Sequence, residues 1–531
     1  MTAAMTVAGR LVRATPGRGI PVDNPATGEV FAHAPACTAD QLDDTVDAAA
    51  TAFRSWAELP LSRRRTLLRA CGPALAARAR ELAELLTREQ GKPLRQALGE
   101  VRTSADWFGH TADLGLNGQR LVDDGTSEIT LERVPYGVVA AIAPSNFPLL
   151  LAVCKIAPAL LAGNTVVLKP APETPLSSLL MGELLNEVLP AGTLSVVSGD
   201  DGVGERLTGH GAVRLISFTG SIPVGKAIAR AAAADLKRVV LELGGNDPAV
   251  VLPDADPERI APALFRRAMA NSGQFCAAIK RIYVPRDRLD RYAGLLADAA
   301  RATVVGDGMD PASDLGPLVS AAQRDRVAGL VDRAVAAGAR VVTGGSVPAG
   351  PGYFYPPTIV ADLPPGTELE AEEQFGPVIP VVPYDSVPEA LDRAGAGDYA
   401  LGCSLWGGER EAGKLASRVE CGTVWINTHG DLRHDVPFGG HRASGVGVEY
   451  GPWGLLEFTQ IKVRNIALHA GPDGAPDRPP EAAAATEPPG TPVAPGTPGT
   501  PGTPVTPVAP ESSAPAATAG TADTAGSATT A

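Results

Sequence analysis

Long hydrophobic runs and a surplus of basic residues are both missing from this chain of 531 residues. No run of about eighteen apolar residues occurs, and residues 1–13 lack the apolar segment of a signal peptide, so we expect no membrane span and no secretory leader. The 46 Lys and Arg residues against 59 Asp and Glu give a formal net charge of -13. This balance argues against nucleic acid or an anionic membrane as a partner.

Cysteine is scarce as well. The six cysteines lie far apart, and none of them forms a Cys-x-x-Cys pair. We therefore expect neither a disulfide framework nor a metal site. Widely spaced, reduced thiols are typical of a protein of the cytoplasm.

The length of the chain predicts more than one domain, because single hydrophobic cores stop growing near about 250–300 residues. From residue 471 onward the composition changes to Pro-Gly-Thr repeats, followed by small residues with almost no large apolar side chains. Such a segment cannot offset its ordering entropy by burial, so we expect residues 471–531 to be a disordered tail. A tethering or docking role for the tail is the less favoured alternative.

Strand and helix patterns alternate before the tail. Short β-branched runs typical of buried strands occupy residues 138–142, 165–168 and 215–218, and helical patterns lie between them at residues 177–189 and 224–234. Strand, helix and strand at this spacing predict a parallel α/β sheet with both faces covered.

A second alternating series begins at residues 281–284 and ends at residues 423–426. The first hundred residues are mainly helical in pattern, as at residues 51–56 and 63–90. The fold class is therefore α/β, with two alternating series behind a helical N-terminal region.

Cys276 and Glu242 are the candidate catalytic pair. Cys276 is followed by two small residues that leave room for a substrate carbonyl, and a thiolate is the strongest side-chain nucleophile near neutral pH. Glu242 lies on a glycine-rich turn at residues 241–245 and is a candidate general base. Taken singly, a buried structural thiol and a hydrogen-bonded carboxylate at a strand end are the commoner interpretations.

Three further motifs follow predicted strands. The glycine-rich turn at residues 218–225 opens a helix, where backbone can approach a phosphate, although it lacks the usual Gly-x-Gly-x-x-Gly spacing. Lys169 could bind a ribose or phosphate, or be a surface lysine beside a proline turn. Asn146, between Pro144 and Pro148, could donate to an oxyanion, which is worth about 3–4 kcal/mol elsewhere, or cap a turn.

Together these motifs resemble those of the aldehyde dehydrogenase superfamily, over about residues 20–467. The resemblance rests on seven blocks in family order: residues 144–148, Lys169, and residues 218–225, 241–245, 273–276, 372–377 and 437–440.

The resemblance implies a fold with three parts: a Rossmann-type cofactor domain, an α/β catalytic domain and a small β arm for oligomerisation. The expected divisions are residues 1–113 and 137–241, residues 242–440, and residues 114–136 and 457–468, respectively. Residues 125–134 also show the alternation of an exposed two-stranded flap, an edge that needs a partner. We therefore expect a homodimer or homotetramer.

The resemblance also implies NAD(P)-dependent oxidation of an aldehyde to a carboxylic acid through a cysteine thioester. Cys276 matches the nucleophile and Glu242 the base that activates water for hydrolysis. Asn146 and the backbone NH of Cys276 match the oxyanion hole. Lys155 and Glu449 match residues that tune or relay protons in relatives.

For the cofactor, Lys169 matches the adenosine-ribose ligand, Glu373 the nicotinamide-ribose ligand, and Phe375 a residue packed near the nicotinamide. The remaining residues expected on the cofactor side are Ser145, Gly220, Ser221, Val224, Gly225 and Leu243.

Three departures from the family pattern stand out. Ser145 replaces a common Trp, and Phe275 is larger than the usual residue before the nucleophile. Pro172 stands where NAD-preferring relatives carry a glutamate, with Glu173 one position later. We expect NAD as the cofactor, with NADP possible.

His429 and His434 lie in a loop expected at the substrate mouth, where either could contact a polar substrate or simply be exposed. A CoA-acylating relative and a non-catalytic fold-mate are the alternative functions. Glu242 argues against the first and Cys276 against the second.

Overall fold

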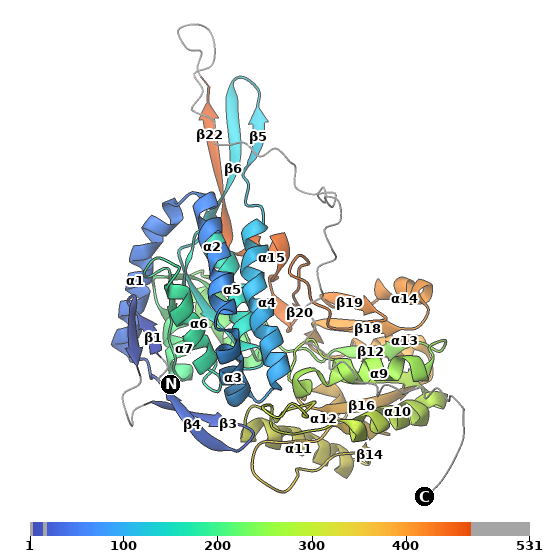
Figure 1. The fold of residues 1–531 in the computed structure, drawn as a ribbon. Coiled ribbons are helices and arrows are strands. Elements are labelled where there is room, and N and C mark those ends of the chain that lie inside the picture. Colours follow the sequence, from blue (N-terminus) through green and yellow to red (C-terminus); the bar gives the residue numbers. More distant parts are fainter. Residues whose placement is uncertain (1–3, 14–18, 469–531) are drawn as a thin grey trace, which may run out of the picture.

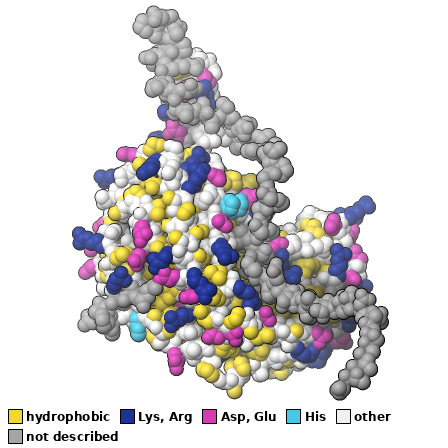
Figure 2. All heavy atoms as spheres, viewed as in Figure 1, with side chains coloured by type: hydrophobic (Ala, Val, Ile, Leu, Met, Phe, Trp, Pro, Cys, Tyr) yellow, Lys and Arg dark blue, Asp and Glu magenta, His cyan; other side chains and the backbone are white. Residues whose placement is uncertain are grey.

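The computed structural model describes residues 4–13 and 19–468, and the predicted tail at 471–531 lies outside them. Two α/β sheets form the body, and a three-stranded arm projects from it (Figure 1). Within the described ranges, no helix is both long and apolar enough to cross a membrane. On the face in Figure 2, basic and acidic side chains are interspersed.

The first sheet has six strands in the order β21-β11-β10-β7-β8-β9. Five strands run parallel, and the short β21 pairs antiparallel with β11. Their bounds are β7 (Val138–Ile142), β8 (Thr165–Lys169), β9 (Leu194–Val196), β10 (Val213–Thr219), β11 (Arg238–Glu242) and β21 (Gly445–Val446). The three strands predicted from β-branched runs are β7, β8 and β10, so the parallel sheet is confirmed.

Helices cover this sheet. They are α5 (Pro148–Ala162), α6 (Leu176–Asn186), α7 (Asp201–Gly209) and α8 (Ile222–Ala234), together with the N-terminal helices α1 (Ala39–Glu58), α2 (Leu61–Ala76), α3 (Ala79–Gln90) and α4 (Leu94–Asp113). Thr38 and Gln41 form a reciprocal capping box that starts α1. The helical pattern at residues 63–90 is divided between two helices, because α2 ends at Ala76 and α3 begins at Ala79. Two short hairpins precede α1: β1 (Ala4–Val7) with β2 (Arg10–Arg13), and β3 (Ile20–Asn24) with β4 (Glu29–Ala34).

The second sheet has seven strands in the order β14-β15-β16-β13-β12-β18-β19. Only β14 is antiparallel to its neighbour. The strands are β12 (Pro248–Val251), β13 (Arg281–Pro285), β14 (Arg340–Thr343), β15 (Thr358–Ala361), β16 (Val378–Tyr384), β18 (Gly402–Trp406) and β19 (Thr423–Ile426). The associated helices are α9 (Pro257–Ala268), α10 (Leu289–Ala302), α11 (Ala321–Ala336), α12 (Glu368–Ala371), α13 (Val387–Ala394) and α14 (Glu409–Ala416). A two-stranded ladder joins β17 (Tyr399–Ala400) to β20 (His441–Arg442).

The arm contains three strands rather than the two-stranded flap expected at residues 125–134. β6 (Ser127–Pro135) pairs with β5 (Gln119–Asp123) on one side and with β22 (Thr459–Ala467) on the other. The β22 strand follows α15 (Gly451–Glu457) and pairs antiparallel with β6 along its full length. Sequence alternation indicated only the hairpin, whereas the family resemblance also assigned residues 457–468, which contain β22, to the arm.

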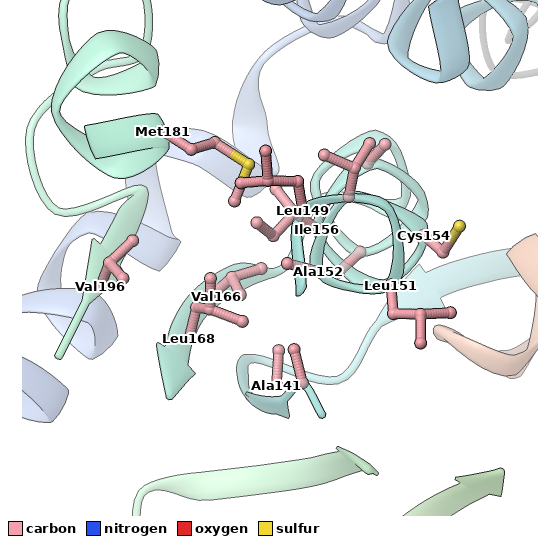
Figure 3. Packing of buried hydrophobic residues seen from close by; sticks show 14 of the residues in the cluster. Ala141, Leu149, Leu151, Ala152, Cys154, Ile156, Val166, Leu168, Met181 and Val196 are labelled. Atoms are coloured by element: carbon pink, nitrogen blue, oxygen red, sulfur yellow. The ribbon is translucent and has the colours of Figure 1, made fainter. Parts of the chain in front are cut away.

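The core beside the candidate site is built on α5, whose residues are nearly all buried. Figure 3 shows Leu149, Ala152 and Ile156 of α5 packed near Val166 and Leu168 of β8. A helix that is apolar around its whole circumference is typical of a core helix. Lys155, the single charged residue of α5, therefore has to find its partners inside the protein.

Candidate active site

Cys276 lies just after a tightly turned segment, the short helix η1 (Ala270–Gly273). Asn271 and Ser272 have φ angles of 50° and 55°, which L-residues rarely adopt. Gly273 has a φ of 74°, and a Cβ there would collide with the carbonyl oxygen of Gly376. This strained turn presents the partly exposed thiol of Cys276 to two cavities.

The first cavity is a cleft of about 830 Å³ between the two sheets. Its lining includes residues that follow β7, β10 and β11 and a segment that follows α12. Of the predicted residues, those that line it are Ser145, Asn146, Gly220, Ser221, Leu243, Cys276, Glu373 and Phe375.

The second cavity is a smaller, mostly apolar pocket on which Cys276 also opens. Glu242 and Glu449 line this pocket together with Cys276. Thr219 and Cys276 belong to both linings, so the cleft and the pocket adjoin at these two residues. The arrangement allows two different molecules to reach one thiol.

Glu242 ends β11 and is buried, yet neither of its carboxylate oxygens has a hydrogen-bond partner among the described residues. Burial and the nearby Glu449 raise the pKa of Glu242 well above its ordinary value, and Lys155 partly offsets them. Burial, Glu373 and Glu242 likewise raise the pKa of the Cys276 thiol. An unpartnered carboxyl group is therefore available beside a thiol that needs a proton acceptor.

Lys155 and Glu449 form a fully buried ion pair, with 2.6 Å between Nζ and Oε1. Lys155 Nζ also donates to Thr219 Oγ1 at 2.6 Å, and Ser217 Oγ lies 3.5 Å from Glu449 Oε1. Lys155 does not line either cavity, whereas Glu449 lines the pocket. The pair holds the Glu449 carboxylate in one place at the pocket wall.

Asn146 follows β7, and its backbone is fixed from two sides. Its carbonyl oxygen accepts hydrogen bonds from Lys92 Nζ at 2.6 Å and from Asn271 Nδ2 at 3.0 Å. Its side-chain Oδ1 accepts from the backbone N of Phe147 at 3.0 Å. Within the described ranges, no group accepts a hydrogen bond from the side-chain NH2, which remains available at the cleft.

The glycine-rich turn after β10 leads directly into α8. The N-cap residue Ser221 makes no capping hydrogen bond with its side chain, so the backbone N–H groups of the first turn keep their capacity to bind an anion. Gly220 N donates to the backbone oxygen of Glu242 at 3.0 Å, which joins this turn to the strand that carries the carboxyl group. A Cβ on Gly225 would lie 2.5 Å from a methyl carbon of Leu243, so the close packing of α8 requires glycine there.

Glu373 closes the other side of the cleft. A Cβ on Gly244 would lie 2.5 Å from Glu373 Oε2, and Glu373 Oε1 has no hydrogen-bond partner in the part of the chain described. Burial raises the pKa of Glu373 to about 7, and Lys280, with Nζ 3.8 Å from Oε1, partly offsets this effect. The Lys280 ammonium also lies 5.0 Å from the centre of the Phe375 ring.

Comparison with known proteins identifies the family of this chain. Residues 12–464 match the model of the aldehyde dehydrogenase family. The chain belongs to the aldehyde dehydrogenase family. It is 38% identical to betaine aldehyde dehydrogenase 1 of Rhizobium meliloti (85% of this chain, 94% of that one) and 38% identical to phenylacetaldehyde dehydrogenase of Pseudomonas fluorescens (87% and 95%).

The solved structures of relatives confirm the aldehyde dehydrogenase fold. The NAD+ complex of aldehyde dehydrogenase from Bacillus cereus has a TM-score of 0.86 at 33% identity, with 88% of this chain and 97% of that chain covered. The recognition of the family and the expected fold class are therefore confirmed, as is an oxidoreductase that acts on aldehydes.

Three predicted cofactor residues of this aldehyde dehydrogenase do not line the cleft: Lys169, Val224 and Gly225. Lys169, at the end of β8, is 4% exposed, and burial lowers its pKa while Asp201, Glu173 and Asp200 oppose that shift. Val224 is 48% exposed on α8. Gly225 is buried and packs against Leu243. Their roles stay predictions.

Neither loop histidine of this aldehyde dehydrogenase lines the cleft or the pocket. His429 is completely buried, with Nε2 3.6 Å from Asp247 Oδ2, and burial lowers its pKa to about 3. His434 stacks on His110, with 3.5 Å between ring centres. The loop does reach the pocket, but through Leu432.

Sequence reasoning missed several charged residues around this site, above all Lys92, Glu100 and Lys280. Lys92 Nζ and Glu100 Oε2 lie 2.6 Å apart in a buried ion pair, and Glu100 Oε1 accepts from the backbone N atoms of Leu149 and Leu150 at the start of α5. Lys280 is only four residues after Cys276, a spacing that could have marked it. No local sequence pattern marks Lys92 or Glu100 as part of the site.

Proposed function

We propose that this aldehyde dehydrogenase oxidises its substrate to a carboxylic acid through covalent intermediates on Cys276, with NAD as the oxidant. The observation that supports this proposal most directly is the position of Cys276. Cys276 lines a large cleft and a small, mostly apolar pocket at once, and an unpartnered buried carboxyl group, Glu242, lines the same pocket.

The residues of the cleft fit a dinucleotide. The turn at Gly220 and Ser221 leaves backbone N–H groups for a pyrophosphate. The Glu373 oxygen Oε1, which has no hydrogen-bond partner among the described residues, suits a hydroxyl of a ribose, and the lack of a side chain on Gly244 keeps the approach open. When bound, the nicotinamide supplies the two-electron oxidant.

Carbon–sulfur bond formation comes first in the proposed sequence. Cys276 Sγ adds to the aldehyde carbon while Glu242 takes the thiol proton, because the raised pKa of the thiol requires a base. The carbonyl oxygen becomes an oxyanion that accepts hydrogen bonds from the Asn146 NH2 and from the backbone NH of Cys276. Lys92 and Asn271 hold the Asn146 backbone in place for this purpose.

Hydrolysis of the thioester on Cys276 completes the sequence. Once Glu242 has released its first proton to solvent, it deprotonates a water molecule that attacks the thioester carbon. The carbon–sulfur bond breaks, the carboxylic acid leaves and the sulfur of Cys276 regains its proton. Lys155 and Glu449 keep charge balanced at the pocket wall during both proton transfers.

Three carboxylates favour NAD over NADP. Glu173, Asp200 and Asp201 act electrostatically on Lys169, the residue that matches the adenosine-ribose ligand. A 2′-phosphate would meet this concentration of negative charge, whereas a free 2′-hydroxyl would not. Pro172 does not supply the usual glutamate, and these three carboxylates are the acidic groups that act on Lys169 instead.

We also propose that residues 1–113 and 137–241 form the cofactor domain around the six-stranded sheet, to which β21 adds an edge strand from beyond residue 440, and that residues 242–440 form the catalytic domain around the seven-stranded sheet. All six cysteines are free, which supports a reducing compartment such as the cytoplasm.

The proposed reaction predicts that purified protein converts an aldehyde to the matching acid with one NADH formed per acid. Reduced cofactor can be followed by absorbance and the acid by chromatography, with NAD and NADP compared at equal concentration. We expect kcat/KM at least tenfold higher with NAD. Relatives named for betaine aldehyde and phenylacetaldehyde define the panel of aldehydes. An acyl product on CoA instead of the free acid would contradict the hydrolytic reaction.

The arm supports assembly into a homodimer or homotetramer. Ile461 and Val463 of β22 are 57% and 56% exposed on a long edge strand, which is a liability for an isolated chain. We expect light scattering after size-exclusion chromatography to give two or four times the chain mass of 54.4 kDa. Asp at both positions should shift the population toward monomer, and Asp at the exposed Leu236 of the body should not. A wild-type monomer would contradict this expectation.

A further inference from the structure

The pocket beside Cys276 is lined mainly by hydrocarbon. Apart from the small and polar residues, its wall consists of Phe147, Leu150, Leu151, Phe275, Leu432, Phe438 and Tyr450. Three carboxyl groups also reach it, those of Glu100, Glu242 and Glu449, and no Lys, Arg or His residue is part of the lining formed by the described residues. Such a wall raises the question of whether the pocket accepts a cation or a neutral group.

Partners inside the protein already neutralise two of the three carboxylates. Glu100 accepts two backbone N–H groups with one oxygen and pairs with Lys92 through the other. Glu449 pairs with Lys155 at 2.6 Å. All four side chains of these pairs are at most 2% exposed, so the pairs contribute little net charge to the pocket. Burial and Glu449 raise the pKa of Glu242, so below that pKa most of this third carboxyl group is protonated and uncharged, and only its ionised fraction acts as the base.

The aromatic rings of the pocket already contact a cation or another ring of the protein. The Lys92 ammonium lies 4.0 Å from the centre of the Phe147 ring and already uses the attraction that this ring offers to a cation. Phe275 meets Phe147 edge to face at 5.3 Å, and Phe438 stacks on Tyr450 at 6.0 Å. A second cation beside Phe147 would find the attraction of that ring already used by Lys92 and would lose its hydration in an apolar wall.

We propose that the aldehyde carries a neutral, apolar alkyl or aryl group, and that the pocket rejects a quaternary ammonium group of the same shape. This inference rests on the proposed function, because it takes the pocket to be the place where the aldehyde's side chain binds. The inference distinguishes cationic from neutral aldehydes. Similarity alone does not, because relatives named for betaine aldehyde and for phenylacetaldehyde are both 38% identical to this chain.

Two aldehydes of matched shape provide the test. In 3,3-dimethylbutanal a carbon atom stands where (trimethylammonio)acetaldehyde has its positively charged nitrogen. We expect kcat/KM with the purified wild-type enzyme and NAD to be at least tenfold higher for the neutral compound, and phenylacetaldehyde to behave like the neutral compound. Equal values, or a preference for the cation, would overturn the inference and leave the proposed function intact.

Leu432 offers a variant that should reverse the preference. Leu432→Glu adds a carboxylate without a partner to the pocket wall, so the neutral-to-cation ratio of kcat/KM should fall at least tenfold. Val436→Glu is the matched control, since Val436 lies four residues along the same loop, is 47% exposed and does not line the pocket. An unchanged ratio in the folded Leu432→Glu variant would overturn the inference.

Binding to the Cys276→Ala variant separates the two proposals. Calorimetric titration with both aldehydes should show at least tenfold tighter binding of the neutral one, whether or not the wild type turns either compound over. Tighter neutral binding combined with no turnover of any aldehyde by the wild type would support the pocket inference and sink the proposed function. Failure of the neutral compound to bind would overturn the inference.

Discussion

Replacement of Cys276 by alanine is expected to lower aldehyde oxidation by about a thousandfold or more, the order of loss seen when an enzyme's nucleophile is removed. The fold and the cofactor cleft should persist, because the substitution removes only the sulfur atom of a residue that lines the two cavities. The measurement is the initial rate of NADH formation, together with NAD binding by fluorescence titration.

Cys421→Ala is the matched control for this variant. Cys421 is also partly exposed and free, but it lines neither the cleft nor the pocket. Its activity should match that of the wild type. Oxidation by Cys276→Ala at more than about a tenth of the wild-type rate would show that another group carries the substrate.

Replacement of Glu242 by glutamine should have the second largest effect. The amide keeps the shape of the carboxyl group but cannot accept a proton, so hydrolysis of the thioester on Cys276 should slow by about 10²–10⁴-fold. An acylated protein, heavier by the mass of the acyl group, should then accumulate and be visible by intact mass spectrometry after a short incubation with aldehyde and NAD.

The pH dependence gives an independent readout of the same carboxyl group. Burial and Glu449 raise the pKa of Glu242 well above its ordinary value, so the active carboxylate form is scarce at low pH and increases as the pH rises. Turnover of the wild type should therefore rise with pH beyond the range in which an ordinary glutamate ionises. Glu242→Gln should lose this rise, whereas Glu187→Gln on the exposed end of α6 should keep it. If the Glu242→Gln variant turned over at the rate of the wild type and no acylated protein accumulated, the general base would have to be another residue.

Much of the first sheet was predictable from sequence because its strands are short β-branched runs buried on both faces. The break between α2 and α3 was not, since neither Ala77 nor Arg78 at the break is a residue that normally interrupts a helix. The alternation pattern does not predict the third strand of the arm, because β22 is separated from β6 by more than 300 residues of sequence, and only the family resemblance assigned residues 457–468 to the arm.

Some residues of the candidate site were likewise predictable from sequence and others were not. Cys276, Glu242 and Asn146 lie at strand ends or tight turns, where glycine and proline mark the sequence. Lys92 and Glu100 belong to the helical N-terminal region, and they become part of the site only when α5 packs against it. Patterns along the chain cannot predict a contact that depends on which helices pack together.

The two cavities that meet at Cys276 have nearly separate linings. Within the described ranges, the cleft and the pocket have only Thr219 and Cys276 in common. A substitution at Leu432 or Phe438 therefore changes the pocket and leaves the wall of the cleft as it was, while one at Ser145 or Leu243 does the reverse. During evolution, the choice of aldehyde and the choice of dinucleotide can diverge independently, provided that the shared sulfur stays in place.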